Sequence, residues 1–154
     1  MINYTYKQFS NDVEKLSQTI ACMEEVSTPH LRWQPNTVVS IARGGLVPGV
    51  YLSHSLNIKN VPIVWQTRDG CTKEPIPDTL LSKGCQLLIV DDINDSGDTL
   101  KYIEDNFGRP NEKIKFAVLI NNKPSKASVD YFGYEINKEE VPAWIVFPWE
   151  EWSK

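Results

Sequence analysis

The sequence predicts an α/β protein in which a central, mostly parallel sheet is flanked by helices. Three mainly apolar runs, at residues 37–41, 87–90 and 115–120, predict buried strands, and the run at 87–90 is uninterrupted, as in a strand covered on both faces. The first two lead directly into a turn and then a helical pattern, which is the order of elements in open α/β sheets. The chain of 154 residues fits one domain with a substantial core.

The first third of the chain predicts one strand–turn–helix unit after an N-terminal helix. Apolar residues alternate over 2–6, which indicates a short edge strand. From Tyr6 to Met23 they recur every three or four positions, which predicts an amphipathic helix. Thr37–Ile41 has the β-branched residues of a buried strand, and Val47–Leu56 predicts the following helix.

The rest of the chain predicts further strands, a helix, an exposed loop and an aromatic tail. Val61–Trp65 predicts a further strand, and the polar, Gly- and Pro-containing segment Thr67–Asp78 predicts an exposed loop. Leu100–Phe107 predicts a helix after the second apolar run. The tail, Val141–Trp152, is dense in aromatic residues. It is either an edge strand that completes the core or a surface that stacks on a planar ring.

Charge and cysteine content exclude several classes of protein. The formal net charge of −4 argues against nucleic acid or an anionic membrane surface as the main partner. Cys22, Cys71 and Cys85 are scattered and odd in number, which predicts free thiols in a reducing cytosol. The sequence shows no signal peptide and no apolar run of transmembrane length, so we expect a cytoplasmic protein without integral membrane association.

The stretch after the second apolar run carries the most specific chemistry. Backbone N–H groups of residues 95–99, with the hydroxyls of Ser96 and Thr99, can cradle a phosphate, and Gly97 permits close backbone approach. Asp91 and Asp92 would repel that phosphate, so sugar hydroxyls or Mg²⁺ are their natural partners. Together these groups suit a phosphorylated ribose. The alternative is ordinary capping of the next helix, which leaves the acidic pair unexplained.

A second turn, after the first buried strand, carries a cation instead of carboxylates. Its two glycines let N–H groups face an anion, and Arg43 adds a planar donor suited to phosphate. By itself a Gly-Gly turn is equally typical of a plain strand-to-helix connection. Beside the acidic stretch, however, this turn predicts a second anion-binding loop.

Two of these segments carry a family resemblance. VDDINDSGDT resembles the phosphoribosyl pyrophosphate (PRPP) signature of type I phosphoribosyltransferases, and SIARGGLVPG resembles the pyrophosphate loop of their xanthine-guanine and hypoxanthine branch. The resemblance implies the type I phosphoribosyltransferase fold as one domain, with a core over about 1–125 and a C-terminal base-binding hood over about 126–154.

The same resemblance implies a role for each motif residue. Arg43 and Gly44 would hold the pyrophosphate, and Asp91 and Asp92 the ribose hydroxyls or Mg²⁺. Asp95 would be the general base. The sugar phosphate would lie against the loop formed by Asp95, Ser96, Gly97, Asp98 and Thr99.

Two further segments resemble the purine-binding parts of the family. Lys123-Pro124 matches a Lys-Pro pair whose lysine donates to the exocyclic oxygen of the purine. In the tail, the resemblance implies that Trp144 stacks on the base, that the Ile145 carbonyl contacts a ring substituent, and that the Pro-Trp-Glu segment at 148–150 supports them.

The chain also departs from the family pattern at three places. Its loop at 67–78, where the family has a lid, is short and lacks the usual Ser-Tyr pair. Asn94 is polar at a position that is more often apolar, and Asp98 brings a carboxylate close to the phosphate. If Asp98 points outward, only its N–H faces the phosphate.

The resemblance implies transfer of ribosyl phosphate from PRPP to guanine, xanthine or hypoxanthine, with Mg²⁺ as the cofactor. The family often forms dimers or tetramers, so we expect a homo-oligomer whose other partners are small molecules. Two alternatives stay open: a PRPP-sensing regulator without turnover, and a phosphoribosyltransferase for another base.

Overall fold

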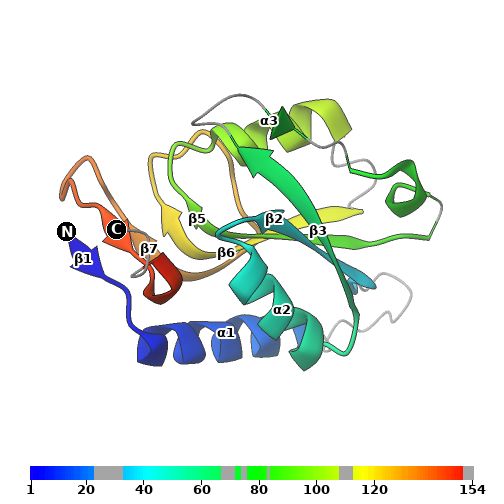
Figure 1. Ribbon diagram of the computed structural model, residues 1–154, viewed down its shortest axis with the longest axis horizontal. Helices are drawn as coiled ribbons and strands as arrows, with labels where there is room; N and C mark the ends of the chain where they lie inside the picture. Colours follow the sequence, from blue (N-terminus) through cyan, green and yellow to red (C-terminus); the bar gives the residue numbers. More distant parts are fainter. Residues whose placement is uncertain (23–32, 67–71, 74–75, 83, 108–112, 151–154) are drawn as a thin grey trace.

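The computed structural model describes residues 1–22, 33–66, 72–73, 76–82, 84–107 and 113–150. Six strands form one sheet in the order β4-β3-β2-β5-β6-β7, and all neighbours are parallel except β3 and β4 (Figure 1). The strands are β2 (Thr37–Ala42), β3 (Lys59–Gln66), β4 (Thr72–Lys73), β5 (Leu87–Asn94), β6 (Ile114–Asn122) and β7 (Tyr131–Ile136).

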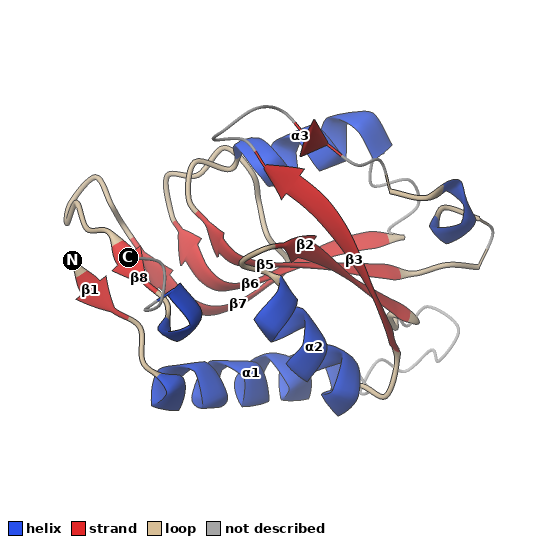
Figure 2. Ribbon diagram, in the orientation of Figure 1, coloured by secondary structure: helices blue, strands red, loops and turns tan. Residues whose placement is uncertain are grey.

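Helices cover both faces of this sheet. α1 (Tyr6–Ala21) and α2 (Leu46–Ser55) lie on one face, and α3 (Asp98–Phe107) lies on the other (Figure 2). Thr5 caps α1 in a capping box with Gln8, which satisfies backbone groups at the start of the helix. The layered arrangement confirms the predicted α/β class.

The central strands are buried on both sides, as their mainly apolar runs predict. Val38 and Leu88 belong to the core cluster beneath α1 and α2, whereas their neighbours Val39 and Ile89 belong to the cluster that contains Leu100 and Ile103 of α3. Because alternate side chains of β2 and β5 enter different cores, these two strands are the rigid centre that positions the turns following them.

Most predicted elements are present, with boundaries shifted by one to four residues. The predicted helix over 6–23 is α1, although its first residue, Tyr6, is exposed, and the predicted strand over 87–90 extends to Asn94. β7 was not predicted. It joins the central sheet beside β6, so the segment 126–154 contributes one strand to that sheet.

The two ends of the described chain meet in a second, smaller sheet. β1 (Ile2–Asn3) pairs in parallel with β8 (Ile145–Val146), and the two lie side by side at the left of Figure 1. A short 3-10 helix, η5 (Pro148–Glu150), follows β8. The aromatic tail is thus held by the first residues of the chain.

Two sequence-based expectations concern free cysteines and membrane-spanning helices. Cys22 and Cys85 are free, as predicted, while Cys71 lies outside the described residues. Among the helices that the structure describes, none is both long enough and apolar enough to span a bilayer.

Candidate active site

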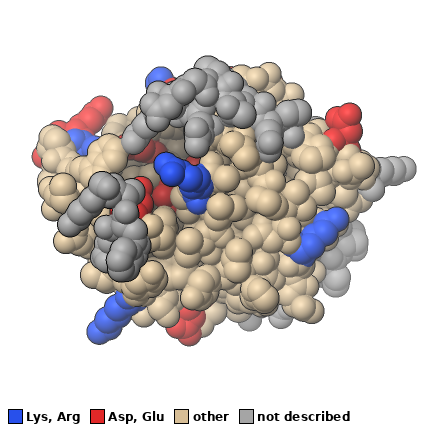
Figure 3. Space-filling view, viewed as in Figure 1, with Lys and Arg blue, Asp and Glu red and all other residues tan. Residues whose placement is uncertain are grey.

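The site forms where the parallel strands end. β2 and β5 pair in register from Thr37 opposite Leu87 to Ser40 opposite Val90, so the turns that follow them meet at one edge of the sheet. A pocket of about 490 Å³ opens there. Figure 3 shows acidic and basic side chains gathered on this part of the surface. Among the predicted residues, the pocket is lined by Arg43, Gly44, Asp91, Asp92, Asp95, Ser96, Gly97, Asp98, Thr99, Trp144 and Ile145.

Gly97 fixes the path of the loop between β5 and α3. Its φ is +85°, a backbone conformation that side chains disfavour. A Cβ at this position would lie 2.6 Å from the Ala127 nitrogen and 2.8 Å from the Lys126 nitrogen, besides meeting the Ser125 hydroxyl. The Lys126 N–H also donates to the Ser96 carbonyl at 3.1 Å. The loop is therefore packed directly onto the turn after β6.

The hydrogen bonds of Asn94 explain why a polar residue lies at the end of β5. It is 1% exposed, and its amide group donates to the Asn121 side-chain oxygen at 2.9 Å and to the Ala127 carbonyl at 2.8 Å. Its own oxygen accepts from the Ser125 hydroxyl at 2.8 Å. A buried amide with these partners fastens the loop at 95–99 to the β6–β7 turn.

The Asp98 carboxylate at the start of α3 is paired with Lys126, from the turn after β6. It lies 2.8 Å from the Lys126 ammonium and accepts from the Ser96 hydroxyl at 2.8 Å. The hydrogen bonds from Lys126 and Ser96 hold the pKa of Asp98 below its usual value. Both partners of the ion pair are exposed, so the negative charge is offset at the rim. The capping interpretation thus holds for Ser96 and Asp98.

The acidic pair at the end of β5 forms the negative part of the pocket. Burial raises the pKa of Asp91 well above its usual value, and the charge of Asp92 adds to that rise. Burial, with a contribution from the charge of Glu150, raises the pKa of Asp92 to about 6. A Cβ on Gly44 would collide with the Asp92 carboxylate, so the absence of a side chain there lets the arginine-bearing turn lie against it. This concentration of carboxylates calls for a cation or hydroxyl donors.

Replacing Asp92 by Asn is expected to stabilise the ligand-free protein at pH 8. Because its pKa is about 6 in the folded state and 3.8 ordinarily, the folded protein binds more protons, and stability falls as pH rises from about 4 to about 6. The neutral amide avoids this loss, which is about 3 kcal/mol at about 1.4 kcal/mol per pKa unit. Urea unfolding at pH 4 and pH 8 measures it.

Glu139→Gln is the matched control for this comparison, since Glu139 is exposed and does not line the pocket. Its effect on the free energy of unfolding should be small at both pH values. An equal change for Asp92→Asn at pH 4 and pH 8 would contradict the assigned pKa.

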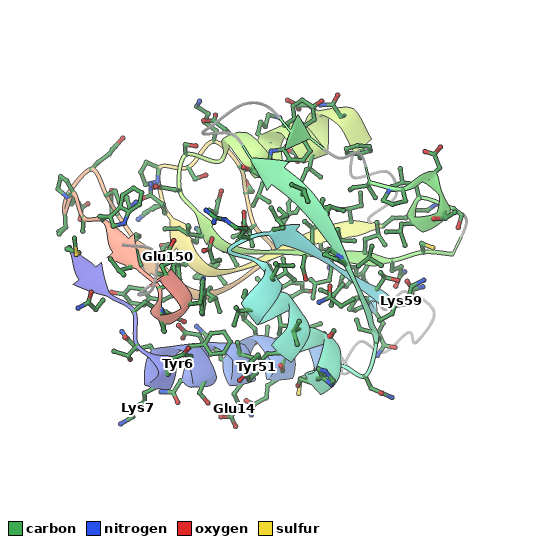
Figure 4. All side chains as sticks on the ribbon, viewed as in Figure 1. Tyr6, Lys7, Glu14, Tyr51, Lys59 and Glu150 are labelled. Atoms are coloured by element: carbon green, nitrogen blue, oxygen red, sulfur yellow. The ribbon has the colours of Figure 1, made fainter. Side chains whose placement is uncertain are left out.

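The aromatic tail divides between the pocket and the core. Trp144 is 51% exposed and lines the pocket, whereas Phe147 is buried and stacks on Trp149, with ring centroids 5.0 Å apart. The Trp144 carbonyl accepts from the Ile2 N–H at 2.8 Å, so β1 holds its backbone in place. Of the two alternatives for this tail, packing into the core describes Phe147 and Trp149, whereas Trp144 is an exposed residue that lines the pocket. Glu150, labelled in Figure 4, comes from η5 and lines the same pocket.

The structure does not bring every predicted residue to the site. Lys123 is exposed on the turn after β6 and is not among the pocket-lining residues. Lys138, which was not predicted, lines the pocket and pairs with Asp95. The contact between Lys123 and the base stays a prediction. Most of the loop at 67–78, considered as a lid, lies outside the described residues.

Comparisons with known proteins agree with this geometry. The family described as "Phosphoribosyl transferase domain" matches residues 7–153. The xanthine-guanine phosphoribosyltransferase of Cereibacter sphaeroides is 32% identical over 120 residues, covering 73% of this chain and 68% of that protein.

Solved structures give the same result. The purine phosphoribosyltransferase from Pyrococcus horikoshii has a TM-score of 0.75 and 26% identity, covering 98% of this chain and 95% of that one. Xanthine-guanine-hypoxanthine phosphoribosyltransferase from Helicobacter pylori has a TM-score of 0.73 and 25% identity, with coverage of 97% and 93%. The strand-end pocket and these matches together show that the chain belongs to the type I phosphoribosyltransferase family of enzymes.

Proposed function

We propose that this chain transfers ribosyl phosphate from PRPP to guanine, xanthine or hypoxanthine in purine salvage. The observation that carries the proposal is that one pocket is lined by the phosphate loop, the acidic pair, the arginine turn and an exposed tryptophan. These groups match the parts of the two substrates: phosphate, sugar hydroxyls, pyrophosphate and a planar base. The names of the similar proteins support an oxopurine as the base.

The reaction assigns one task to each side of the pocket. The ring nitrogen of the base forms a bond to the anomeric carbon of the ribose while the bond from that carbon to pyrophosphate breaks, and the electron pair leaves with the pyrophosphate. Asp91 and Asp92 stabilise the positive charge that grows on the sugar. Arg43 and the N–H groups beside Gly44 neutralise the departing pyrophosphate. Asp95 accepts the proton lost by the ring nitrogen.

The acidic pair also fits the magnesium ion that the family generally uses. Within the described residues, no three His, Cys, Asp or Glu side chains are grouped to hold a metal by themselves. Mg²⁺ is commonly held by one or two carboxylates together with substrate phosphates, so Asp91 and Asp92 suit an ion that arrives with PRPP. When bound, this ion would neutralise charge on the pyrophosphate.

Pyrophosphate release by the purified protein tests the proposal. The assay supplies Mg²⁺ and PRPP and offers guanine, xanthine, hypoxanthine, adenine and uracil separately. Turnover with an oxopurine is the expected result, and the ranking of kcat/KM identifies the preferred base. Tight PRPP binding without turnover on any base would favour the PRPP-sensing regulator. Preferred use of uracil would assign the protein to another branch of the family.

Replacing Trp144 by Ala is expected to weaken binding of the base far more than binding of PRPP. Loss of one stacking face costs about 1 to 3 kcal/mol, which corresponds to about 5- to 150-fold in KM for the base. Tyr134→Ala is a suitable control, because Tyr134 is 58% exposed and does not line the pocket. Equal losses for both substrates would show that Trp144 supports the fold and does not stack on the base.

A further inference from the structure

Lys138 is a cation inside the pocket that the function proposed above leaves unused. It lies between β7 and β8, in the orange part of Figure 1, and its side chain is 19% exposed. Its ammonium donates to one carboxylate oxygen of Asp95 at 2.7 Å. A half-buried ion pair of this length is better shielded from solvent than the fully exposed pair between Asp98 and Lys126.

Asn122 joins the same two residues through the end of β6. Its amide nitrogen donates to the Asp95 carbonyl at 3.0 Å and lies 3.5 Å from the second carboxylate oxygen of Asp95. Its amide oxygen accepts from the Lys138 N–H at 3.0 Å. Asn122 is 7% exposed, so this bridge is part of the buried framework. The Asn122 side chain therefore holds the backbone of Asp95 and the backbone of Lys138.

The negative charges around Asp95 explain why the Lys138 ammonium matters for its position. Asp91, Asp92 and Glu150 also line the pocket, and together they would repel a further free carboxylate. Lys138 is the pocket-lining lysine among the described residues, while Arg43 comes from the turn after β2. Asp95 is therefore held by an attractive contact from one side and by an amide from the other.

We propose that Lys138 is a positioning residue that holds the Asp95 carboxylate in the orientation from which it accepts the proton of the attacking base. This inference rests on the proposed function, in which Asp95 is the general base. Proton transfer requires the acceptor within hydrogen-bond reach and correctly aimed, and small displacements of a catalytic group cost up to about 10²-fold in rate. Lys138 acts through Asp95 and need not touch either substrate.

Three variants test this role: Lys138→Met, Lys138→Arg and Lys101→Met. Lys138→Met keeps most of the side-chain volume and removes the charge, so kcat should fall by about 10- to 100-fold while KM for PRPP changes little. Lys138→Arg should restore most of the activity. Lys101→Met is the matched control, because Lys101 is ion-paired with Glu104 and Asp105 on α3 and does not line the pocket.

A double-mutant cycle with Asp95→Asn separates positioning from other roles. If Lys138 acts through Asp95, Lys138→Met should cost almost nothing further in the Asp95→Asn background. Full additivity of the two losses would overturn the inference, as would wild-type kcat in Lys138→Met. Thermal unfolding of each variant checks that the fold is retained.

Pyrophosphate release by the wild-type protein distinguishes a failure of this inference from a failure of the proposed function. Absence of pyrophosphate release with every base would reject the function itself. A crystal structure of Lys138→Met tests the contact without turnover. There the Asp95 carboxylate should leave its present orientation, and an unchanged carboxylate would overturn the positioning role.

Discussion

Asp95→Asn is expected to lower kcat by about 10²- to 10⁴-fold, the usual contribution of a general base, and to leave PRPP binding nearly unchanged. The reason is geometric as well as chemical. Asp95 lines the pocket at the start of the phosphate loop, and its main-chain carbonyl is held by Asn122 at 3.0 Å. Because Asn has nearly the same shape, the loop should keep its path while the side chain can no longer accept a proton. Steady-state kinetics of pyrophosphate release, with KM determined separately for each substrate, measures the effect.

Asp105→Asn is the control for this variant, since Asp105 is ion-paired with Lys101 on α3 outside the pocket. It should retain wild-type kcat. Unchanged turnover in Asp95→Asn would remove Asp95 from the mechanism. A large rise in KM for PRPP with unchanged kcat would instead assign it to sugar-phosphate binding.

Gly97→Ala is expected to have the second large effect, on PRPP binding. The position has φ of +85°, where a side chain costs about 1 to 2 kcal/mol, and its Cβ would displace the Lys126 and Ala127 backbone. A displaced loop loses one or more backbone hydrogen bonds to the phosphate, each contributing about 1.5 to 3 kcal/mol. KM for PRPP should therefore rise by about 10- to 150-fold. Titration calorimetry with PRPP and Mg²⁺ measures the affinity directly.

Gly84→Ala provides an unusually close control. Gly84 also has positive φ, at +91°, but no atom lies within 4 Å of the position that a Cβ would occupy. This variant carries the backbone strain without the collision, so it should lose some stability and keep its affinity for PRPP. Equal weakening in both variants would show that loss of stability, and not displacement of the loop, is responsible.

The fold was predictable wherever a strand is buried on both faces. The apolar runs of β2, β5 and β6 identify them without reference to other sequences. β7 escaped prediction because Gly133 occupies one of its inward positions and supplies no side chain to the alternating pattern. A Cβ there would meet the Asp12 side chain and the Leu119 carbonyl. The close packing of α1 on the sheet therefore requires glycine at position 133, and this glycine interrupts the apolar pattern by which the strand could have been predicted.

The site was predictable where several polar groups lie together at one strand end, as in the acidic stretch at the end of β5 and the loop that follows it. Lys138 was not, because it precedes Glu139 and Glu140 in a polar segment typical of a solvated surface. Its role depends on where β7 directs the chain, which the sequence did not indicate. Lys123 was predicted from a local Lys-Pro match; it is exposed and does not line the pocket, and its contact with the base stays a prediction.

The pairing of β1 with β8 has a consequence for the order in which the two halves of the pocket assemble. The loop at 95–99 is fastened by the contact from Asn94 to Ala127, which are 33 positions apart, whereas the backbone at Trp144 depends on Ile2, from the opposite end of the described chain. Contacts between such distant segments close late in folding. The β1–β8 sheet consists of two strands of two residues each, and small elements of this kind open at lower free energy than the core. The half of the pocket at 95–99 can thus remain folded while the half at Trp144 opens and closes.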